Sequence, residues 1–246
     1  MKVILEENHG ICNITLNNGM INSITTELLN NLINYITNAE KTYEGIIITG
    51  NEKFFSMGFH LPELLQKDEK NLLDFYNLFN EFILKLYTLP IPTCSVLTGH
   101  AVAGGCIIAL ATDFRFAVPA KKIGLNEINI GLPVPLLAQE ILNNIVFGKY
   151  FKEMLYFGEF ITTNVAYNFG LVDEIFTFED IHNKAFEKIK LLSQKNKKAF
   201  SIMKSNFTKT IVRKYREHKD LDSELFIKCW FNDDTQNLLK EASKKF

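Results

Sequence analysis

The stretch GHAVAGGCIIALATDF, from Gly99 to Phe114, decides the fold of this 246-residue chain. Gly104 and Gly105 separate the apolar run TCSVLTG before them from the small-residue run CIIALATD after them. The first run predicts a buried strand and the second a helix. Glycines at such a junction allow close backbone approach, and the first turn of a helix has N–H groups without intrahelical partners. The stretch can therefore stabilise a negatively charged oxygen, although tight strand-to-helix packing alone explains the glycines equally well.

Strands and helices alternate on both sides of this stretch. EGIIITG, at 44–50, is a β-branched run typical of a strand buried on both faces. Two strands around an HG turn are expected in 1–17, a threonine-capped helix in 24–41, a helix in 71–87 and a strand in 113–119. The alternation predicts an α/β fold with parallel strands and right-handed crossovers.

The pattern becomes helical after about residue 185. Three helical segments are expected, KAFEKIKLLSQKN, AFSIMKSNFTKTIVRKYREH and SELFIKCWFNDDTQNLLKEASKKF. The basic residues of this region, Lys204 among them, are expected on a solvated face, with a minority possibility of contact to phosphates. We therefore expect a core over 1–185 and a helical C-terminal region over 186–246.

Composition excludes several classes of function. A formal net charge of −1 provides no long-range field for polyanions, so a nucleic-acid partner is not expected. The four cysteines include no CxxC pair, which argues against a disulfide framework or a zinc site and favours a reducing, cytoplasmic setting. No apolar run reaches membrane-spanning length, and the start lacks the apolar region of a secretory signal.

Two further segments carry candidate functional residues. FFSMGFHLPELL, at 54–65, follows the strand EGIIITG and places Gly58 at a strand-to-helix connection, where α/β proteins tend to bind ligands. GLNEINIGLPVP, at 124–135, sets a single carboxylate, Glu127, among apolar residues, glycines and prolines. An apolar pocket raises a carboxylate's pKa toward neutrality, which suits a general base. The plainer interpretation makes Glu127 a surface or helix-capping residue, because Glu is rarely buried unpaired.

Four motifs in order resemble the crotonase, or enoyl-CoA hydratase/isomerase, superfamily: FSMGFHL, GHAVAGGCIIALATDFRFA, IGLNEINIGLPVP and AYNFGLVDEIF. The similarity extends from the first strands to about Phe176. It implies a ClpP/crotonase-type spiral of ββα units with a helical C-terminal trimerisation region, assembled as a homotrimer or a dimer of trimers. It also implies an acyl-CoA thioester as ligand, whose enolate is held by two backbone N–H groups, and no metal or redox cofactor.

Site residues follow from the resemblance position by position. Phe59 and Gly104 resemble the two backbone donors of the family's oxyanion hole. The loop that contacts CoA in the family matches Met57, Gly58, His60 and Leu61. Phe54, Phe55 and Phe75 are candidates to line an acyl tunnel.

Two acid positions separate the reactions of the family. Hydratases carry one glutamate shortly after the glycines and a second in the motif that reads GLNE here. In this chain Ile107 occupies the first position and Glu127 the second. Hydration divides water activation and proton delivery between two carboxylates, whereas an allylic proton shift needs one. The pattern thus resembles the delta(3),delta(2)-enoyl-CoA isomerases, with Glu127 as the shuttling base in β-oxidation of unsaturated acyl chains.

Other functions stay open from the sequence. A hydratase, a thioester hydrolase or a carnitinyl-CoA epimerase would need a second acid outside the usual position. A non-catalytic acyl-CoA-binding protein would keep the fold while Glu127 is incidental. A carboxylate other than Glu127 facing the pocket would favour the hydratase.

Overall fold

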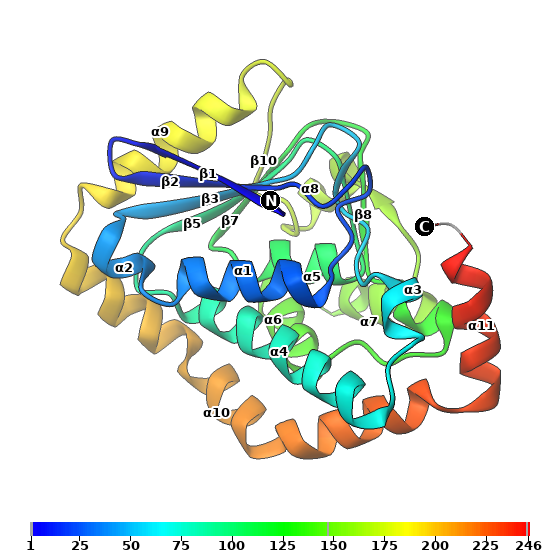
Figure 1. Cartoon of the computed structure of the whole chain (residues 1–246). Helices are drawn as coiled ribbons and strands as arrows, with labels where there is room; N and C mark the ends of the chain where they lie inside the picture. The colour runs from blue at the N-terminus through cyan, green and yellow to red at the C-terminus, as the bar shows by residue number, and fades with distance from the viewer. Residues whose placement is uncertain (1, 147, 245) are drawn as a thin grey trace.

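The computed structural model of the chain describes residues 2–146, 148–244 and 246. Two β-sheets form its centre, and helices cover them (Figure 1). In Figure 1 the helix α9 lies on one side of the larger sheet and the helices α1 and α5 on the other. The predicted α/β class is therefore confirmed.

The larger sheet has the order β1-β2-β3-β5-β7-β10 within the described residues. β1 and β2 pair antiparallel around a turn at His9, and the other neighbours pair in parallel. The bounds are β1 (Val3–Asn8), β2 (Ile11–Leu16), β3 (Gly45–Thr49), β5 (Thr93–Leu97), β7 (Phe114–Ala117) and β10 (Glu174–Ile175). Ile46 and Ile48 of β3 join the main core while Ile47 joins a smaller core under α9, so this strand is buried on both faces as predicted.

The smaller sheet has the order β4-β6-β8-β9, and sequence reasoning missed it. Its strands are short: β4 (Phe54–Ser56), β6 (His100–Val102), β8 (Lys122–Gly124) and β9 (Ile161–Thr162). β4, β6 and β8 run parallel, and β9 pairs antiparallel to β8. Strands of three residues are too short to show a clear period of two.

Each strand of the larger sheet from β3 to β7 is followed by one of the smaller sheet and then by helix. The repeats β3-β4-α4, β5-β6-α5 and β7-β8-α6 form the expected spiral of ββα units. The helices here are α1 (Thr26–Ile36), α2 (Ala39–Thr42), α3 (Leu61–Leu64), α4 (Glu69–Thr88), α5 (Gly104–Leu110), the 3-10 helix η1 (Glu127–Ile130), α6 (Leu136–Ile145), α7 (Lys149–Phe157) and α8 (Thr163–Asn168). Thr25 caps α1 as predicted, by accepting a hydrogen bond from the Leu28 N–H.

The C-terminal helices are α9 (Ile181–Ser193), α10 (Lys197–Trp230) and α11 (Asp233–Ser243). The last two predicted segments do not break where expected: one helix runs through Trp230, because no glycine or proline interrupts it. Asn232 then starts α11 by accepting a hydrogen bond from the Asp234 N–H. The division expected after residue 185 falls inside α9, which packs against β3 and β5.

Lys204 corrects the expectation of a solvated basic face on α10. Its side chain is buried, and its ammonium lies 2.8 Å from the Asp113 carboxylate and donates to the Ile91 carbonyl at 3.3 Å. Burial lowers the pKa of Lys204, which Asp113 opposes. This pair attaches α10 to the strand ends near β5 and β7.

Candidate active site

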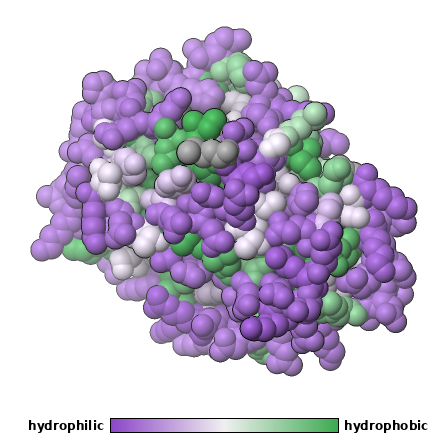
Figure 2. All heavy atoms as spheres, in the orientation of Figure 1, coloured by the Kyte–Doolittle hydropathy of each residue, from purple (hydrophilic) through white to green (hydrophobic). Residues whose placement is uncertain are grey.

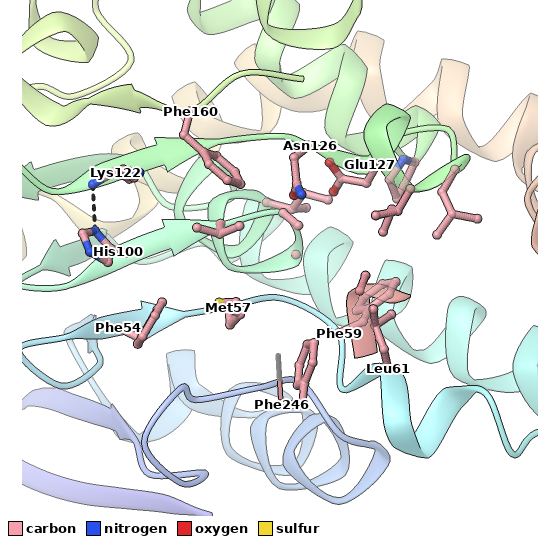
Figure 3. Close-up of a pocket in the computed structure, with 18 of the residues that line it drawn as sticks. Phe54, Met57, Phe59, Leu61, His100, Lys122, Asn126, Glu127, Phe160 and Phe246 are labelled. Atoms are coloured by element: carbon pink, nitrogen blue, oxygen red, sulfur yellow. Dashed lines mark hydrogen bonds between the residues drawn. The ribbon is translucent and has the colours of Figure 1, made fainter. Parts of the chain in front are cut away.

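A cavity of about 340 Å³ lies beside the carboxyl ends of three parallel strands. β4 leads into Met57 and Phe59, β6 into Gly104, and β8 into Asn126 and Glu127. Because these strands are parallel neighbours, their ends bring together segments that are far apart in the sequence. Figure 3 shows Glu127 and Asn126 on one side of the cavity and Met57 and Phe59 on the other.

The backbone of Phe59 is fixed by its neighbours. The Ile24 N–H donates to the Gly58 carbonyl at 2.7 Å, and the His60 N–H donates to the Ile24 carbonyl at 3.0 Å. In an extended segment the Phe59 N–H then points away from Ile24. It donates no hydrogen bond among the described residues, so it is free to meet a ligand.

Gly104 begins α5, where the first N–H groups have no intrahelical acceptor. Its N–H also lacks a partner within the described part of the chain. Ala103, just before it, has a φ of 47°, an unusual value for a residue with a side chain, and its N–H donates to the Gly124 carbonyl at 2.9 Å. This hydrogen bond holds the turn between β6 and α5 in place.

Two glycines let the donor segments approach each other. A Cβ built on Gly58, whose φ is +90°, would lie 3.0 Å from the Ala103 Cβ and 3.1 Å from the Gly104 nitrogen. A Cβ on Gly105 would lie only 2.3 Å from the Ser56 carbonyl oxygen. Two unpaired N–H groups, of Phe59 and Gly104, are thus held near each other at the cavity wall.

Glu127 is the first residue of η1 and is only 7% exposed. Its Oε2 atom has no hydrogen-bond partner in the described structure. Burial raises the pKa of Glu127 to about 7, and the backbone groups of Glu127 and Asn126 oppose the rise. A carboxylate with such a pKa can take and return a proton near neutral pH.

The local sequence explains how η1 buries this acid. Gly131 ends η1 with a φ of +76°, and the Leu132 N–H donates back to the Glu127 carbonyl at 3.0 Å. Thr235 of α11 donates its hydroxyl to the Gly131 carbonyl at 3.3 Å, so the C-terminal helix supports this turn. A Cβ on Gly131 would lie 2.6 Å from that hydroxyl oxygen.

Ile107, which stands where a hydratase would carry its first glutamate, leaves that part of the cavity wall apolar. Ile107 is 1% exposed and lines the cavity one turn along α5 from Gly104. Among the described residues that line the cavity, Glu127 has the only carboxylate side chain. Cys106, next to Ile107, is fully buried, and burial raises the pKa of its thiol, as expected for a small buried side chain.

One end of the cavity is polar. His100 and Lys122 line it, and the Lys122 backbone N–H donates to the His100 Nδ1 at 2.9 Å (Figure 3). Burial and the nearby lysines Lys121, Lys122 and Lys53 lower the pKa of His100. Because its Nδ1 accepts that hydrogen bond, the neutral His100 ring carries its proton on Nε2. Lys122 and the nearby lysines make this end of the cavity basic.

The sequence-predicted residues divide into two groups. Met57 and Leu61 line the cavity together with Phe59, Gly104 and Glu127. Gly58 and His60 do not: Gly58 shapes the backbone, and the His60 Nδ1 accepts a hydrogen bond from the Glu63 N–H at the start of α3. Of the three candidate tunnel phenylalanines, Phe54 lines the cavity, Phe55 is core, and Phe75 packs behind Phe59 at 5.0 Å between ring centres.

Several lining residues have no local signal in the sequence. Phe226 of α10, Ala242 of α11 and Phe246 come from the helical C-terminal region, about a hundred residues after Glu127. Phe160 and Asn126 were also missed. The sequence next to these residues does not mark them as cavity residues. Phe226, Ala242 and Phe246 reach the cavity only because the C-terminal helices fold against it.

No group of three or more His, Cys, Asp or Glu side chains suited to a metal ion occurs among residues 2–146, 148–244 and 246. None of the helices in those ranges is both long enough and apolar enough to span a membrane. On the face shown in Figure 2, hydrophobic residues form small patches separated by hydrophilic ones.

Known proteins resemble this chain in sequence and in fold. The family model for enoyl-CoA hydratase/isomerase matches residues 6–246. The human protein "Enoyl-CoA delta isomerase 1, mitochondrial" is 25% identical over 236 residues, which cover 94% of this chain and 78% of the human protein.

Two solved structures share the fold. The human mitochondrial delta3-delta2-enoyl-CoA isomerase has a TM-score of 0.95 at 24% identity, covering 100% of this chain and 98% of that chain. An enoyl-CoA hydratase from Bacillus halodurans has a TM-score of 0.88 at 22% identity, covering 98% and 100%. At these identities the likeness shows the crotonase fold, which hosts both reactions. The match of the family model over nearly the whole chain shows that the protein belongs to the enoyl-CoA hydratase/isomerase family.

Proposed function

We propose that this protein is an enoyl-CoA isomerase that moves the double bond of a 3-enoyl-CoA thioester to the 2-position. The observation that carries the proposal is the lone, buried carboxylate: Glu127 has a pKa of about 7, and Ile107 occupies the place of a second acid. One carboxylate suffices for an allylic shift, whereas hydration needs water activation and proton delivery together. The name of the human relative supports the same choice.

The chemistry follows from the positions of three groups. The thioester oxygen accepts hydrogen bonds from the N–H groups of Phe59 and Gly104, which stabilise negative charge on it. Glu127 removes a proton from C2, and the electron pair delocalises into a dienolate. The Glu127 carboxylic acid then returns the proton to C4, so the double bond lies between C2 and C3 and Glu127 is ionised again. The step requires no metal or redox cofactor.

The two ends of the cavity orient the substrate. The polar end, with His100 and Lys122, suits the phosphate-bearing CoA part of the thioester. In Figure 3 Met57 lies between that end and Leu61, which supports a role for Met57 in CoA contact, whereas Leu61 lies toward the apolar end. Gly58 shapes the backbone of the same loop, and the His60 side chain caps the start of α3.

The proposal also covers the assembly of subunits, the division of the chain into a core over 1–185 and a C-terminal region over 186–246, and the location in the cell. Large apolar side chains on α7 and α10 are exposed, among them Phe157 at 65% and Phe207 at 63%. Such exposure supports self-association, and we propose a homotrimer or a dimer of trimers, with residues 186–246 supplying contacts between subunits. A cytoplasmic location stays a prediction.

The test is a product analysis of the purified protein. 3-Enoyl-CoA and 2-enoyl-CoA are supplied separately, and the conjugated enoyl absorbance and 3-hydroxyacyl-CoA are followed. We expect conversion of 3-enoyl to 2-enoyl with negligible hydration. Hydration as fast as isomerisation would overturn the proposal in favour of a hydratase, and binding of acyl-CoA without any turnover would favour a non-catalytic binding protein.

A further inference from the structure

The cavity has an apolar end opposite its basic end. His100 and Lys122 mark the basic end in Figure 3, and Leu61 lies toward the other. The chain runs from Lys122 through Glu127 to the lining residues Leu132 and Pro135. Phe226 is tied to this segment, because the Leu136 N–H donates to Asp222, one turn before Phe226, so we place these lining residues beyond Glu127. If the CoA part occupies the basic end and the thioester oxygen the two N–H groups, the acyl chain extends toward Phe226. This orientation rests on the proposed function.

Phe226 is the aromatic residue that α10 contributes to this cavity. Its side chain is 2% exposed and lines the cavity, although α10 is otherwise an outer helix. Its ring stacks on Tyr76 of α4, with ring centres 4.0 Å apart and an interplanar angle of 19°. Trp230, one turn further along α10, lies 6.1 Å away between ring centres.

The ring behind Phe226 is itself held in place. The Tyr76 hydroxyl donates to the Asp222 carboxylate at 2.7 Å, and the Leu136 N–H donates to the other oxygen of Asp222 at 3.1 Å. Asp222 lies one turn before Phe226 on α10, and Leu136 directly follows the cavity residue Pro135. These hydrogen bonds join α4, α6 and α10 behind the cavity, so the stack is a rigid stop.

We propose that Phe226, backed by Tyr76, closes the acyl end of the cavity and sets the longest acyl chain that the protein accepts. The residue is a specificity determinant that takes no part in proton transfer. A smaller side chain deepens the cavity because the hydrogen-bonded Tyr76 does not move forward to fill the space. A larger side chain makes the cavity shallower.

Three variants test the proposal: Phe226→Leu, Phe226→Trp and, as a control outside the proposed subunit contacts, Phe178→Leu. Phe178 is 42% exposed and lies outside the cavity. Affinities for saturated acyl-CoA esters of short, medium and long chains are measured by calorimetry, and kcat/KM is measured for the matching 3-enoyl-CoA esters. Thermal unfolding confirms that each variant is folded.

Two ratios are compared, the long-chain to short-chain ratio of affinities and the same ratio of kcat/KM values. In Phe226→Leu both ratios are expected to rise on the order of tenfold. In Phe226→Trp both ratios are expected to fall, and in Phe178→Leu they are expected to match wild type. An unchanged ratio in a folded Phe226→Leu, or an equal loss for all chain lengths, would overturn the proposal. The saturated esters separate the two hypotheses, because a shift in binding without any isomerisation supports the acyl stop and refutes the isomerase.

Discussion

The two walls that flank the unpaired N–H groups of Phe59 and Gly104 have opposite burial patterns. In α5 every residue from Gly104 to Leu110 is buried and none is charged. In η1 the charged residue Glu127 is the only buried one, while Ile128 is 45% exposed. The helix therefore supplies a donor and an apolar wall, and the short 3-10 turn supplies the acid.

This difference shows how one fold can host different reactions. Ile107 and Glu127 face the same cavity from two successive ββα units. A carboxylate on both walls would give the pair that hydration requires, whereas a carboxylate on η1 alone gives a single base. The proposed role of Glu127 rests on this burial pattern of η1, because an unpaired Glu is seldom buried for stability.

Removal of the acid from η1 gives the largest expected effect. Glu127→Gln keeps the shape of the side chain but cannot accept a proton, so isomerisation should fall by about 10²–10⁴-fold. Binding of acyl-CoA should change little, as calorimetry can check. The control is Glu140→Gln on α6, whose ion pair with Lys214 lies at the surface, and its rate should equal wild type. An equal loss in both variants would contradict a special role for Glu127.

The same substitution should change how stability depends on pH. The pKa of Glu127 rises from 4.5 to about 7 on folding, so the folded state keeps a proton that the unfolded state has lost between these values. Wild type therefore loses stability as pH rises through this window, by about 3 kcal/mol in total. The free energy of unfolding of Glu127→Gln lacks this pH-dependent loss. The difference in that free energy between the variant and wild type should therefore grow in favour of the variant from pH 4.5 to above 7, which chemical unfolding measures. A constant difference would show that the pKa is not raised.

Crowding of the donor segments should reduce activity by about 10–10²-fold. Gly58→Ala introduces a Cβ 3.1 Å from the Gly104 nitrogen and an unfavourable positive φ, so both donors should shift. Gly148→Ala has a similar strain, with a φ of +61°, but nothing lies within 4 Å of its Cβ. The control should lose stability without losing the rate per folded molecule, and equal rates in the two variants would exclude the crowding effect.

Addition of an acid to the α5 wall gives the smallest expected effect. Ile107→Glu places a second carboxylate in the cavity, and hydration of 2-enoyl-CoA should rise by about tenfold over wild type. Ile107→Gln introduces a side chain of the same shape without the acid and should not gain hydration. A folded Ile107→Glu that isomerises but does not hydrate would show that the missing acid does not decide the reaction.

The local patterns predicted much of the fold but not its second layer. The β-branched run of β3, the capped helix α1 and the glycine junction before α5 all appear as predicted, because burial on both faces, capping and close packing depend on nearby residues. The smaller sheet was missed, since β4, β6 and β8 have three residues each.

The site divides in the same way. Glu127 and the Phe59 and Gly104 segments carry local motifs, and the structure brings them to one cavity. Phe226 carries no local motif, because it reaches the cavity only through the packing of α10 against α4 and α6. A tertiary contact of this kind has no signature in the neighbouring sequence.

The pH dependence of kcat/KM for isomerisation, from about pH 5 to about pH 9, tests the central claim of a single base most directly. Glu127 must be ionised to accept the first proton, so the rate should rise about tenfold per pH unit below about 7 and stay level above it. Cys106 does not interfere, because burial raises the pKa of its thiol. A single ascending limb that ends near pH 7 is the predicted result. A bell-shaped profile would require a second, protonated group and would contradict the account.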